Sequence, residues 1–238
     1  MAIDKRKLAY ARRYIRVFGV LSVFLLIPIA VILLLNNSEQ RFQEPPIYGP
    51  KLVNSPGDTT YHHIPDFQFT SHYGEPFTED SLRGKIHIAD FIFTNCPGIC
   101  PMMSASMQEV VNELQEKFPE VIFVSYTIDP ANDTVPALQA YAQRYDAPKR
   151  RWYFVRADSA SQVYKLAQEG YFMSAGQSPE GPEDGFFHDN RFAVVDQNLR
   201  IRGYFQGITD DQYYEQTKDL VETVQVLVYK MRKQEEQD

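Results

Sequence analysis

The only two cysteines of this chain lie in one short stretch, TNCPGICPMM, at residues 94–103. Cys96 and Cys100 are four positions apart, and a proline follows each of them. Two thiols at this spacing can form a structural disulfide, exchange disulfides with another protein or bind a soft metal. A disulfide that closes so short a loop restricts the unfolded chain only weakly. The pair therefore favours redox chemistry or metal binding over a structural role.

The residue after the second cysteine places the pair at the start of a helix. Pro101 follows Cys100 directly, and proline is well tolerated in the first turn of a helix, where its missing N–H is no loss. The cysteines would then lie beside free N–H groups and the positive end of the helix dipole. Both effects favour the thiolate and lower the pKa of a thiol. We therefore expect both sulfurs to be reactive and to be good ligands for a soft metal.

Two sulfurs rarely complete a metal site, so a third donor is needed. The chain has five histidines, His62, His63, His72, His87 and His188. His87 lies within the apolar stretch KIHIADF and is expected in the core, while the adjacent His62 and His63 are more typical of solvated side chains than of a second site. His188 ends the Gly- and Pro-rich stretch AGQSPEGPEDGFFH, directly before a predicted strand. A long loop can carry this ring to another loop, which makes His188 a candidate ligand on position alone.

Three methionines next to the cysteines also carry soft sulfur. Met103 and Met107 fall on the apolar face of the predicted helix, where core packing explains them. Met102 does not share that face as clearly, and its role stays open.

Hydrophobic patterning predicts the elements that position these residues. Apolar strands alternate with helical periodicity: strands at 85–93, 121–129 and 151–158, and helices at 103–118, 138–145 and 159–170. A short strand and turn at 66–78 come before them, and a hairpin across Gln197-Asn198 and a helix near 209–233 follow. This order predicts a layered α/β domain with a mixed sheet. The cysteines fall at the carboxyl end of a central strand, where such sheets usually bind ligands.

The N-terminal segment predicts a membrane anchor. Six basic residues and one acid occupy residues 1–16, and an uncharged apolar run follows at 17–35, long enough to span a bilayer. Neither a small-residue cleavage pattern nor a cysteine for lipid attachment follows the run. We expect a single-pass protein with its N-terminus in the cytoplasm and its domain outside, in the periplasm of a bacterial inner membrane. That compartment permits disulfides.

The same features divide the chain into five parts. We expect a cytoplasmic segment at 1–16, an anchor at 17–35, a Pro-containing linker at 36–60, a domain at 61–233 and a charged tail at 234–238. The net charge is −7, and the basic residues are concentrated at the N-terminus. This distribution argues against a nucleic-acid binder, because no basic face would offset phosphate repulsion.

Three stretches, in the same order, resemble the Sco/SenC family of membrane-anchored, thioredoxin-like proteins that assemble cytochrome c oxidase. The signature around that family's Cys-x-x-x-Cys pair is similar to FIFTNCPGICPMM here. Its D-P-x-x-D-T segment resembles YTIDPANDTVPALQAYAQRY, and its histidine before a strand resembles FFHDNRFAVVD. The resemblance covers roughly residues 64–228.

The resemblance implies a thioredoxin-like α/β fold in which Cys96, Cys100 and His188 bind one copper ion, as Cu(I) or also as Cu(II). It links Asp129 to the integrity of that site, although Asp129 suits the capping of its own turn equally well. The implied partners are the oxidase subunit that carries the copper A centre, a copper donor and a thiol reductase. The chain departs from the family after Trp152 and in the residues DNR after His188, which leaves partner recognition and loop motion open.

We therefore expect a copper metallochaperone, a carrier more than an enzyme. A membrane-tethered thiol–disulfide oxidoreductase that reduces the recipient's cysteines is the alternative, although general thioredoxins have two residues between their cysteines and this chain has three. A copper or redox sensor is a third possibility. A peroxidase is weaker still: Thr94 precedes Cys96 by two positions, but no arginine is clearly placed to polarise a peroxide.

Overall fold

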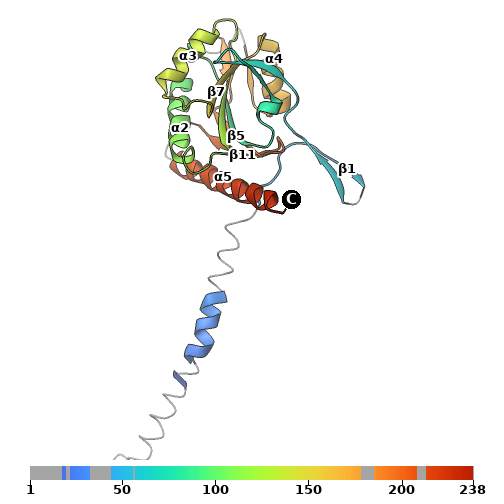
Figure 1. Ribbon diagram of the computed structural model, residues 1–238, viewed down its shortest axis with the longest axis vertical. Helices are drawn as coiled ribbons and strands as arrows, with labels where there is room; N and C mark the ends of the chain where they lie inside the picture. Colours follow the sequence, from blue (N-terminus) through green and yellow to red (C-terminus); the bar gives the residue numbers. More distant parts are fainter. Residues whose placement is uncertain are drawn as a thin grey trace, which may run out of the picture. The chain divides into compact units, whose positions relative to one another are not determined.

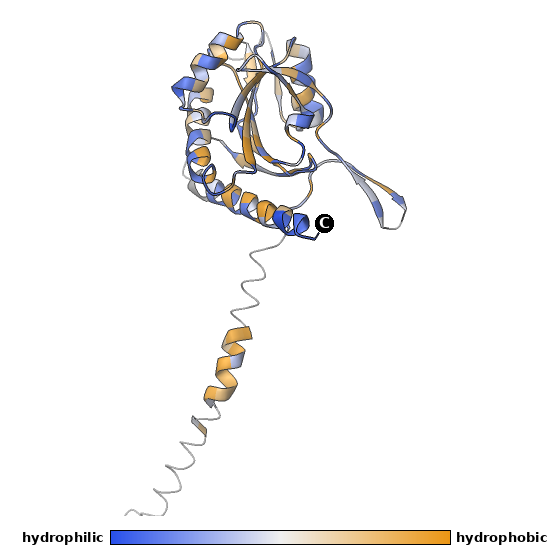
Figure 2. Ribbon diagram, viewed as in Figure 1, coloured by the Kyte–Doolittle hydropathy of each residue, from blue (hydrophilic) through white to orange (hydrophobic). Residues whose placement is uncertain are grey.

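The computed structural model of the protein describes residues 18–19, 22–32, 44–55, 57–177, 185–207 and 213–237. The chain forms two units, Met1–Glu44 and Pro45–Asp238. In the first unit, residues 18–19 and 22–32 are helical, with exposed and mostly apolar side chains (Figure 2). Among the described residues, no helix is both long and apolar enough to cross a bilayer. The predicted segment 1–16 and both ends of the predicted anchor lie outside the described residues, so the anchor stays a prediction.

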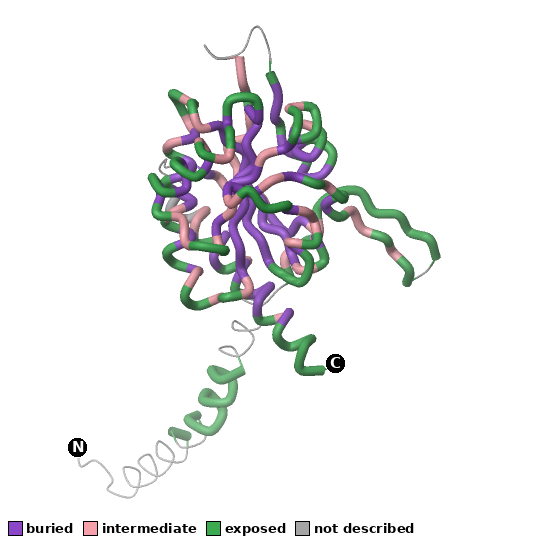
Figure 3. The backbone as a smooth tube through the Cα atoms, turned by 45° about the horizontal axis from the view of Figure 1, so that its top comes forward, coloured by how far each residue is buried: buried purple, intermediate pink, exposed green. Residues whose placement is uncertain are grey.

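A seven-stranded mixed sheet forms the centre of the second unit (Figure 1), in the order β11-β10-β5-β6-β7-β3-β4. The strands are β3 (Gln68–Ser71), β4 (Pro76–Thr78), β5 (Ile86–Ile92), β6 (Val121–Thr127), β7 (Trp152–Arg156), β10 (Arg191–Val195) and β11 (Ile201–Gln206). β5, β6 and β7 are parallel, and every other neighbouring pair is antiparallel. Every residue of β5 and β6 is buried, at the centre of the unit (Figure 3), which explains why both strands are almost continuously apolar.

Helices cover both faces of this sheet. They are α2 (Ile99–Leu114), α3 (Val135–Arg144), α4 (Ala160–Lys165) with the π-helical turn η3 (Leu166–Gly170), and α5 (Tyr213–Glu235); a short 3-10 turn, η2 (Glu79–Ser81), follows β4. α2 and α3 lie on one side and α4 on the other (Figure 1). Tyr141 of α3 packs against Phe154, with ring centroids 5.6 Å apart, and Tyr171 after η3 packs against His87 at 6.2 Å. The predicted mixed α/β fold is confirmed.

The second unit begins at Pro45, so it includes part of the segment predicted to be a linker. Two antiparallel strands, β1 (Lys51–Ser55) and β2 (Asp58–Tyr61), project from its body (Figure 1). The chain before them runs along the sheet, because Arg202 Nε donates to the Pro45 carbonyl at 3.1 Å and Tyr48 N donates to Ile201 O at 2.9 Å. These contacts fix the start of the unit on strand β11.

Candidate metal centre

The two cysteines lie where β5 passes into α2, as the sequence predicts. Gly98 is the N-cap of α2, so Cys100 is the second residue of the helix and Cys96 lies in the loop before it. The first N–H groups of a helix have no partner within the helix. One of them, Cys100 N, donates to Cys96 Sγ at 3.5 Å. Cys96 is half-buried and Cys100 is fully buried, and neither is in a disulfide.

A small sheet that the sequence does not predict brings His188 to these sulfurs. β8 (Ala175–Gln177) and β9 (Phe186–His188) pair antiparallel, with Ala175 opposite His188. Residues 178–184, between the two strands, lie outside the described residues. Gly176 in β8 lets the ring of Phe187 lie close to the backbone, since a Cβ there would lie 2.7 Å from that ring. The pairing fixes the end of the predicted loop and places His188 Nε2 3.0 Å from Cys100 Sγ.

The three predicted ligands form one cluster. One donor atom each from Cys96, Cys100 and His188 lies within 4.8 Å of the others, a spacing that could hold a metal ion. In the part of the chain that the structure describes, no other group of three or more His, Cys, Asp or Glu side chains has this property. The His188 Nδ1 atom is 2.8 Å from the Asp189 carbonyl, which accepts its proton. Nε2 therefore keeps its lone pair toward the sulfurs, the arrangement that a ligating imidazole needs.

The two thiols differ in electrostatic environment. Burial would raise the pKa of Cys96, but the His188 side chain beside it and hydrogen bonds from the backbone N–H groups of Cys100 and Gly98 lower it to about 7. Burial raises the pKa of Cys100 well above its ordinary range, and the neighbouring Cys96 sulfur raises it further. The expectation that the helix start lowers both pKa values is therefore wrong for Cys100. Its sulfur is so deeply enclosed that the loss of solvation outweighs the effect of the helix.

This asymmetry predicts selective alkylation in the reduced, metal-free protein. Iodoacetamide should modify Cys96 first, with a rate that rises with pH through a midpoint near 7, because a thiol reacts as its thiolate and the Cys96 pKa is lowered to about 7. Cys100 should stay unmodified while the protein is folded, since its side chain is fully buried. Peptide mass mapping after short exposures measures both rates. Equal rates at the two positions, or a Cys96 midpoint at the ordinary value of about 8.5, would contradict this prediction.

The other candidate ligands lie elsewhere. His87 is fully buried, as predicted, with Nε2 3.0 Å from the Tyr171 hydroxyl. His62 is half-buried rather than solvated, and its Nε2 is 2.8 Å from the Gly170 carbonyl, while His63 is exposed. Burial of Met103 and Met107 confirms their packing role, and Met102 is 45% exposed. None of these side chains belongs to the cluster.

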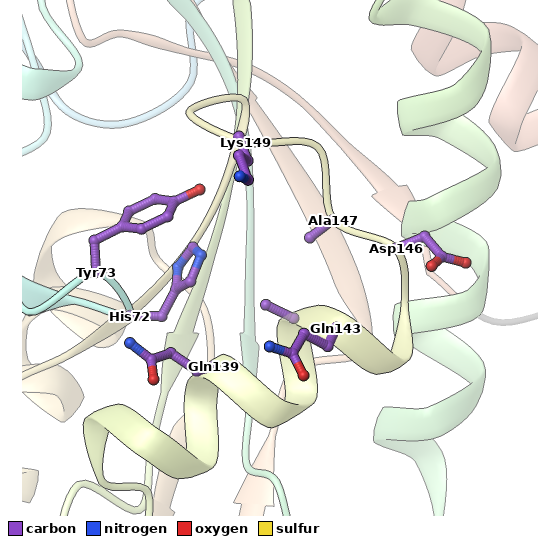
Figure 4. A pocket seen from close by; sticks show the side chains of 8 residues that line it. His72, Tyr73, Gln139, Gln143, Asp146, Ala147 and Lys149 are labelled. Atoms are coloured by element: carbon purple, nitrogen blue, oxygen red, sulfur yellow. The ribbon is translucent and has the colours of Figure 1, made fainter.

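A separate depression of the surface (Figure 4) contains none of the three clustered residues. It lies between the β3–β4 turn, which provides His72 and Tyr73, and α3, which provides Gln139 and Gln143. His72 Nδ1 accepts a hydrogen bond from Phe154 N of β7 at 3.1 Å, so this nitrogen has no lone pair left for a metal. The lining of the depression includes one histidine and one carboxylate, Asp146, but no cysteine, and these side chains do not form a group of three clustered ligands.

A second aspartate, which sequence reasoning missed, supports the cysteine loop. Asp129 accepts a hydrogen bond from Asn132 Nδ2 at 2.8 Å, which caps its own turn. Asp133 is fully buried and accepts hydrogen bonds from the Thr94 backbone N at 3.1 Å, the Thr94 hydroxyl and the Thr127 hydroxyl. Asp133 thus connects the loop before Cys96 to the end of β6. Both aspartates occur in the same stretch, DPANDT, and only the folded chain distinguishes their roles.

We predict that Asp133→Asn is the more damaging of the two aspartate substitutions. An amide cannot accept all three hydrogen bonds, and a buried donor without a partner costs about 1–3 kcal/mol. The free energy of unfolding should fall by about that amount, and the reactivity of Cys96 should change because its loop is released. Asp129→Asn, which keeps an oxygen acceptor toward Asn132, is the matched control and should change both quantities less. If urea denaturation showed a larger loss of stability for Asp129→Asn than for Asp133→Asn, the support of the loop would be assigned to Asp129.

Comparison with known proteins supports the resemblance in sequence. A family model described as SCO1/SenC matches residues 56–224. A SCO1 protein homolog from Bacillus subtilis is 30% identical over 156 residues, which cover 66% of this chain and 80% of that protein. The solved structure of BsSco is 28% identical, with a TM-score of 0.58, and covers 68% of this chain and 93% of its own; it is described as having a disulfide switch and as a member of the Sco family of cytochrome c oxidase assembly proteins.

A copper-bound structure shares the fold. Bradyrhizobium japonicum ScoI with copper bound is 23% identical, with a TM-score of 0.55, and the match covers 67% of this chain and 98% of that one. At this identity the similarity shows the common fold alone. The chain thus has a mixed α/β fold shared with these proteins and carries a Cys–Cys–His cluster at the carboxyl end of a central strand.

Proposed function

Since the chain belongs to the SCO1/SenC family, we propose that Cys96, Cys100 and His188 bind one copper ion and deliver it during assembly of cytochrome c oxidase. The observation that carries this proposal is the cluster of two sulfurs and one imidazole nitrogen within 4.8 Å of one another. These donors come from two parts of the chain that are 88 residues apart, Cys100 at the start of α2 and His188 at the end of β9.

The chemistry of the donor set favours Cu(I). Thiolates are soft ligands that select Cu(I), and imidazole suits copper in either oxidation state. Because metal binding requires deprotonated thiols, copper replaces the two thiol protons and releases them. The high pKa of the buried Cys100 thiol is then no obstacle, since the metal takes the position of the proton. A three-coordinate ion keeps an open side.

Transfer follows from that open side. Cys96 is the more exposed of the two sulfurs, so a thiolate of the recipient would reach the ion from its side. The recipient's ligands replace those of this chain one at a time, and copper moves without becoming free. Oxidation of the pair to a Cys96–Cys100 disulfide removes two of the three ligands, so the redox state of the pair would control loading. A thiol reductase and a copper donor are then needed outside the cytoplasm, with the subunit carrying the copper A centre as recipient.

The test is a Cu(I) titration of the full chain in detergent, in competition with a chromophoric chelator. The reduced protein should bind one equivalent, and the protein oxidised to the Cys96–Cys100 disulfide should bind none. His188→Ala should bind more weakly than the wild type. If the reduced wild type takes up no Cu(I), the copper proposal is wrong; equal affinity in His188→Ala would remove His188 from the site.

The difference between the two thiols favours one second candidate, thiol–disulfide exchange. Cys96, half-buried and with its pKa lowered to about 7, suits attack on a disulfide of the recipient. The buried Cys100 would then displace the recipient from the mixed disulfide, which leaves the recipient with two thiols and this chain with a disulfide. Rapid reduction of a copper-site disulfide by the metal-free protein would support this role, while transfer of copper to an already reduced recipient would support delivery.

A further inference from the structure

We propose that Asp189 and Arg191 form a clamp that positions His188 for metal binding; this inference rests on the proposed copper site. These residues occur in the stretch DNR, directly after His188. Neither residue belongs to the metal-ligand cluster itself. Their role is to hold the imidazole ligand, which lies at the end of β9 in the two-stranded β8–β9 sheet.

Asp189 contacts His188, Ser174 and Arg191 through three separate groups. Its carbonyl accepts the His188 Nδ1 proton at 2.8 Å, and its backbone N donates to Ser174 O at 2.7 Å. Its carboxylate accepts two hydrogen bonds from the Arg191 side chain, from Nε at 2.7 Å and from Nη2 at 2.6 Å. Asp189, whose carbonyl orients the imidazole, is therefore held both through its backbone N–H and through its side chain.

Arg191 connects this arrangement to the main sheet. It is the first residue of β10, which pairs with β11 and, farther along, with β5. Its guanidinium lies 4.6 Å from the centre of the Tyr204 ring, a cation–π contact. Tyr204 is held in turn, because its hydroxyl donates to the Tyr171 carbonyl at 2.7 Å. The position of His188 thus depends on a chain of contacts that ends in the core.

Such a clamp is needed because the β8–β9 sheet has only two strands. An isolated two-stranded ribbon is marginally stable in water, so its own hydrogen bonds fix the imidazole poorly. The planar guanidinium makes two parallel contacts to a carboxylate and stacks on an aromatic ring at the same time. Lysine keeps the positive charge and can approach the ring, but it cannot make the two parallel contacts to the carboxylate. Arg191→Lys therefore removes the geometry of the clamp and preserves the charge beside the site.

The experiment compares Cu(I) affinities of the full chain in detergent, by competition with a chelator. Arg191→Lys and Asp189→Asn should each weaken Cu(I) binding by about 10-fold, the low end of the effect of losing an outer hydrogen bond of a metal ligand, because the Asp189 carbonyl stays and only its support is lost. Asp189→Asn leaves the backbone carbonyl in place, so it tests the carboxylate alone. The matched control is Arg150→Lys: Arg150 also makes two hydrogen bonds to one carboxylate, from Nη1 and Nη2 to Glu75 at 3.1 and 3.0 Å, and it lies outside the cluster. The control should bind Cu(I) like the wild type.

A double-mutant cycle separates positioning of His188 from general stability. In a His188→Ala background, Arg191→Lys should have no further effect on Cu(I) affinity, because its effect passes through the imidazole. An undiminished effect in that background would overturn the inference, as would wild-type affinity in both clamp variants. If Arg191→Lys proves unfolded by circular dichroism, Asp189→Asn decides the question by the same cycle. A wild-type protein that binds no Cu(I) would reject the proposed function and this inference with it.

Discussion

Replacing Cys100 with serine is expected to cause a very large loss of Cu(I) affinity. Cys100 Sγ lies 3.0 Å from His188 Nε2, and its side chain is fully buried, so no water or surface group can substitute for it. A hydroxyl is a hard, weakly acidic donor that does not replace a thiolate toward Cu(I). We expect the Cu(I) affinity to fall by at least about a thousand-fold, which corresponds to about 4 kcal/mol. Competition with a chelator of known affinity measures this loss.

The control for this substitution is Met103→Leu. Met103 is one turn further along the same helix, is also fully buried and also carries a soft sulfur. Leucine conserves its volume, so the core should keep its packing. Unchanged Cu(I) affinity in Met103→Leu, with a large loss in Cys100→Ser, assigns the effect to the thiolate. If Cys100→Ser retained wild-type affinity, the copper would have to bind elsewhere.

Arg202→Ala should cause a large loss of stability. Arg202 and Asp196 form an ion pair at 2.8 Å, with side chains only 5% and 3% exposed, and Arg202 also holds the Pro45 carbonyl. Removing one partner of a buried pair leaves the other charge uncompensated, which typically costs about 3–5 kcal/mol. Urea denaturation followed by the fluorescence of Trp152 measures the change, since this is the only tryptophan of the chain and it is fully buried.

An exposed pair provides the comparison. Arg83 and Asp80 are 3.0 Å apart, but their side chains are 49% and 76% exposed. Such surface pairs contribute about 0–1 kcal/mol, because water already solvates both charges. Arg83→Ala should therefore shift the unfolding midpoint only slightly. A loss below about 1 kcal/mol for Arg202→Ala would mean that the freed space admits water to Asp196, and that burial does not govern this pair.

Two sets of contacts that hold the cluster in place do not involve the cysteine sulfurs. The clamp on His188 and the Thr94–Asp133 contact hold the two sides of the cluster, and neither passes through the sulfurs themselves. Oxidation of the cysteines would therefore leave both supports in place. Reduction would then restore a prepared ligand set without refolding of the domain.

The sequence predicted the elements and the candidate ligands, which the fold brings together. Apolar runs and helical spacing located β5, β6 and α2, because burial of a strand or of one helix face depends on residues that are close in sequence. The same local pattern placed the cysteines between strand and helix. The similarity of three stretches to one family selected His188 as the third ligand, which its position in the chain left open.

The tertiary structure decided what depends on contacts between distant segments. It placed His188 against Cys100 across 88 residues, assigned the support of the loop to Asp133 rather than to Asp129 alone, and began the domain at Pro45. It also reversed the expected pKa shift of Cys100, because the enclosure of that sulfur by other elements outweighs its place at the helix start. Local periodicity specifies which face of an element is apolar. Which elements enclose a given atom, and how completely, is set by the packing of the whole sheet, and the reactivity of each thiol follows from that enclosure.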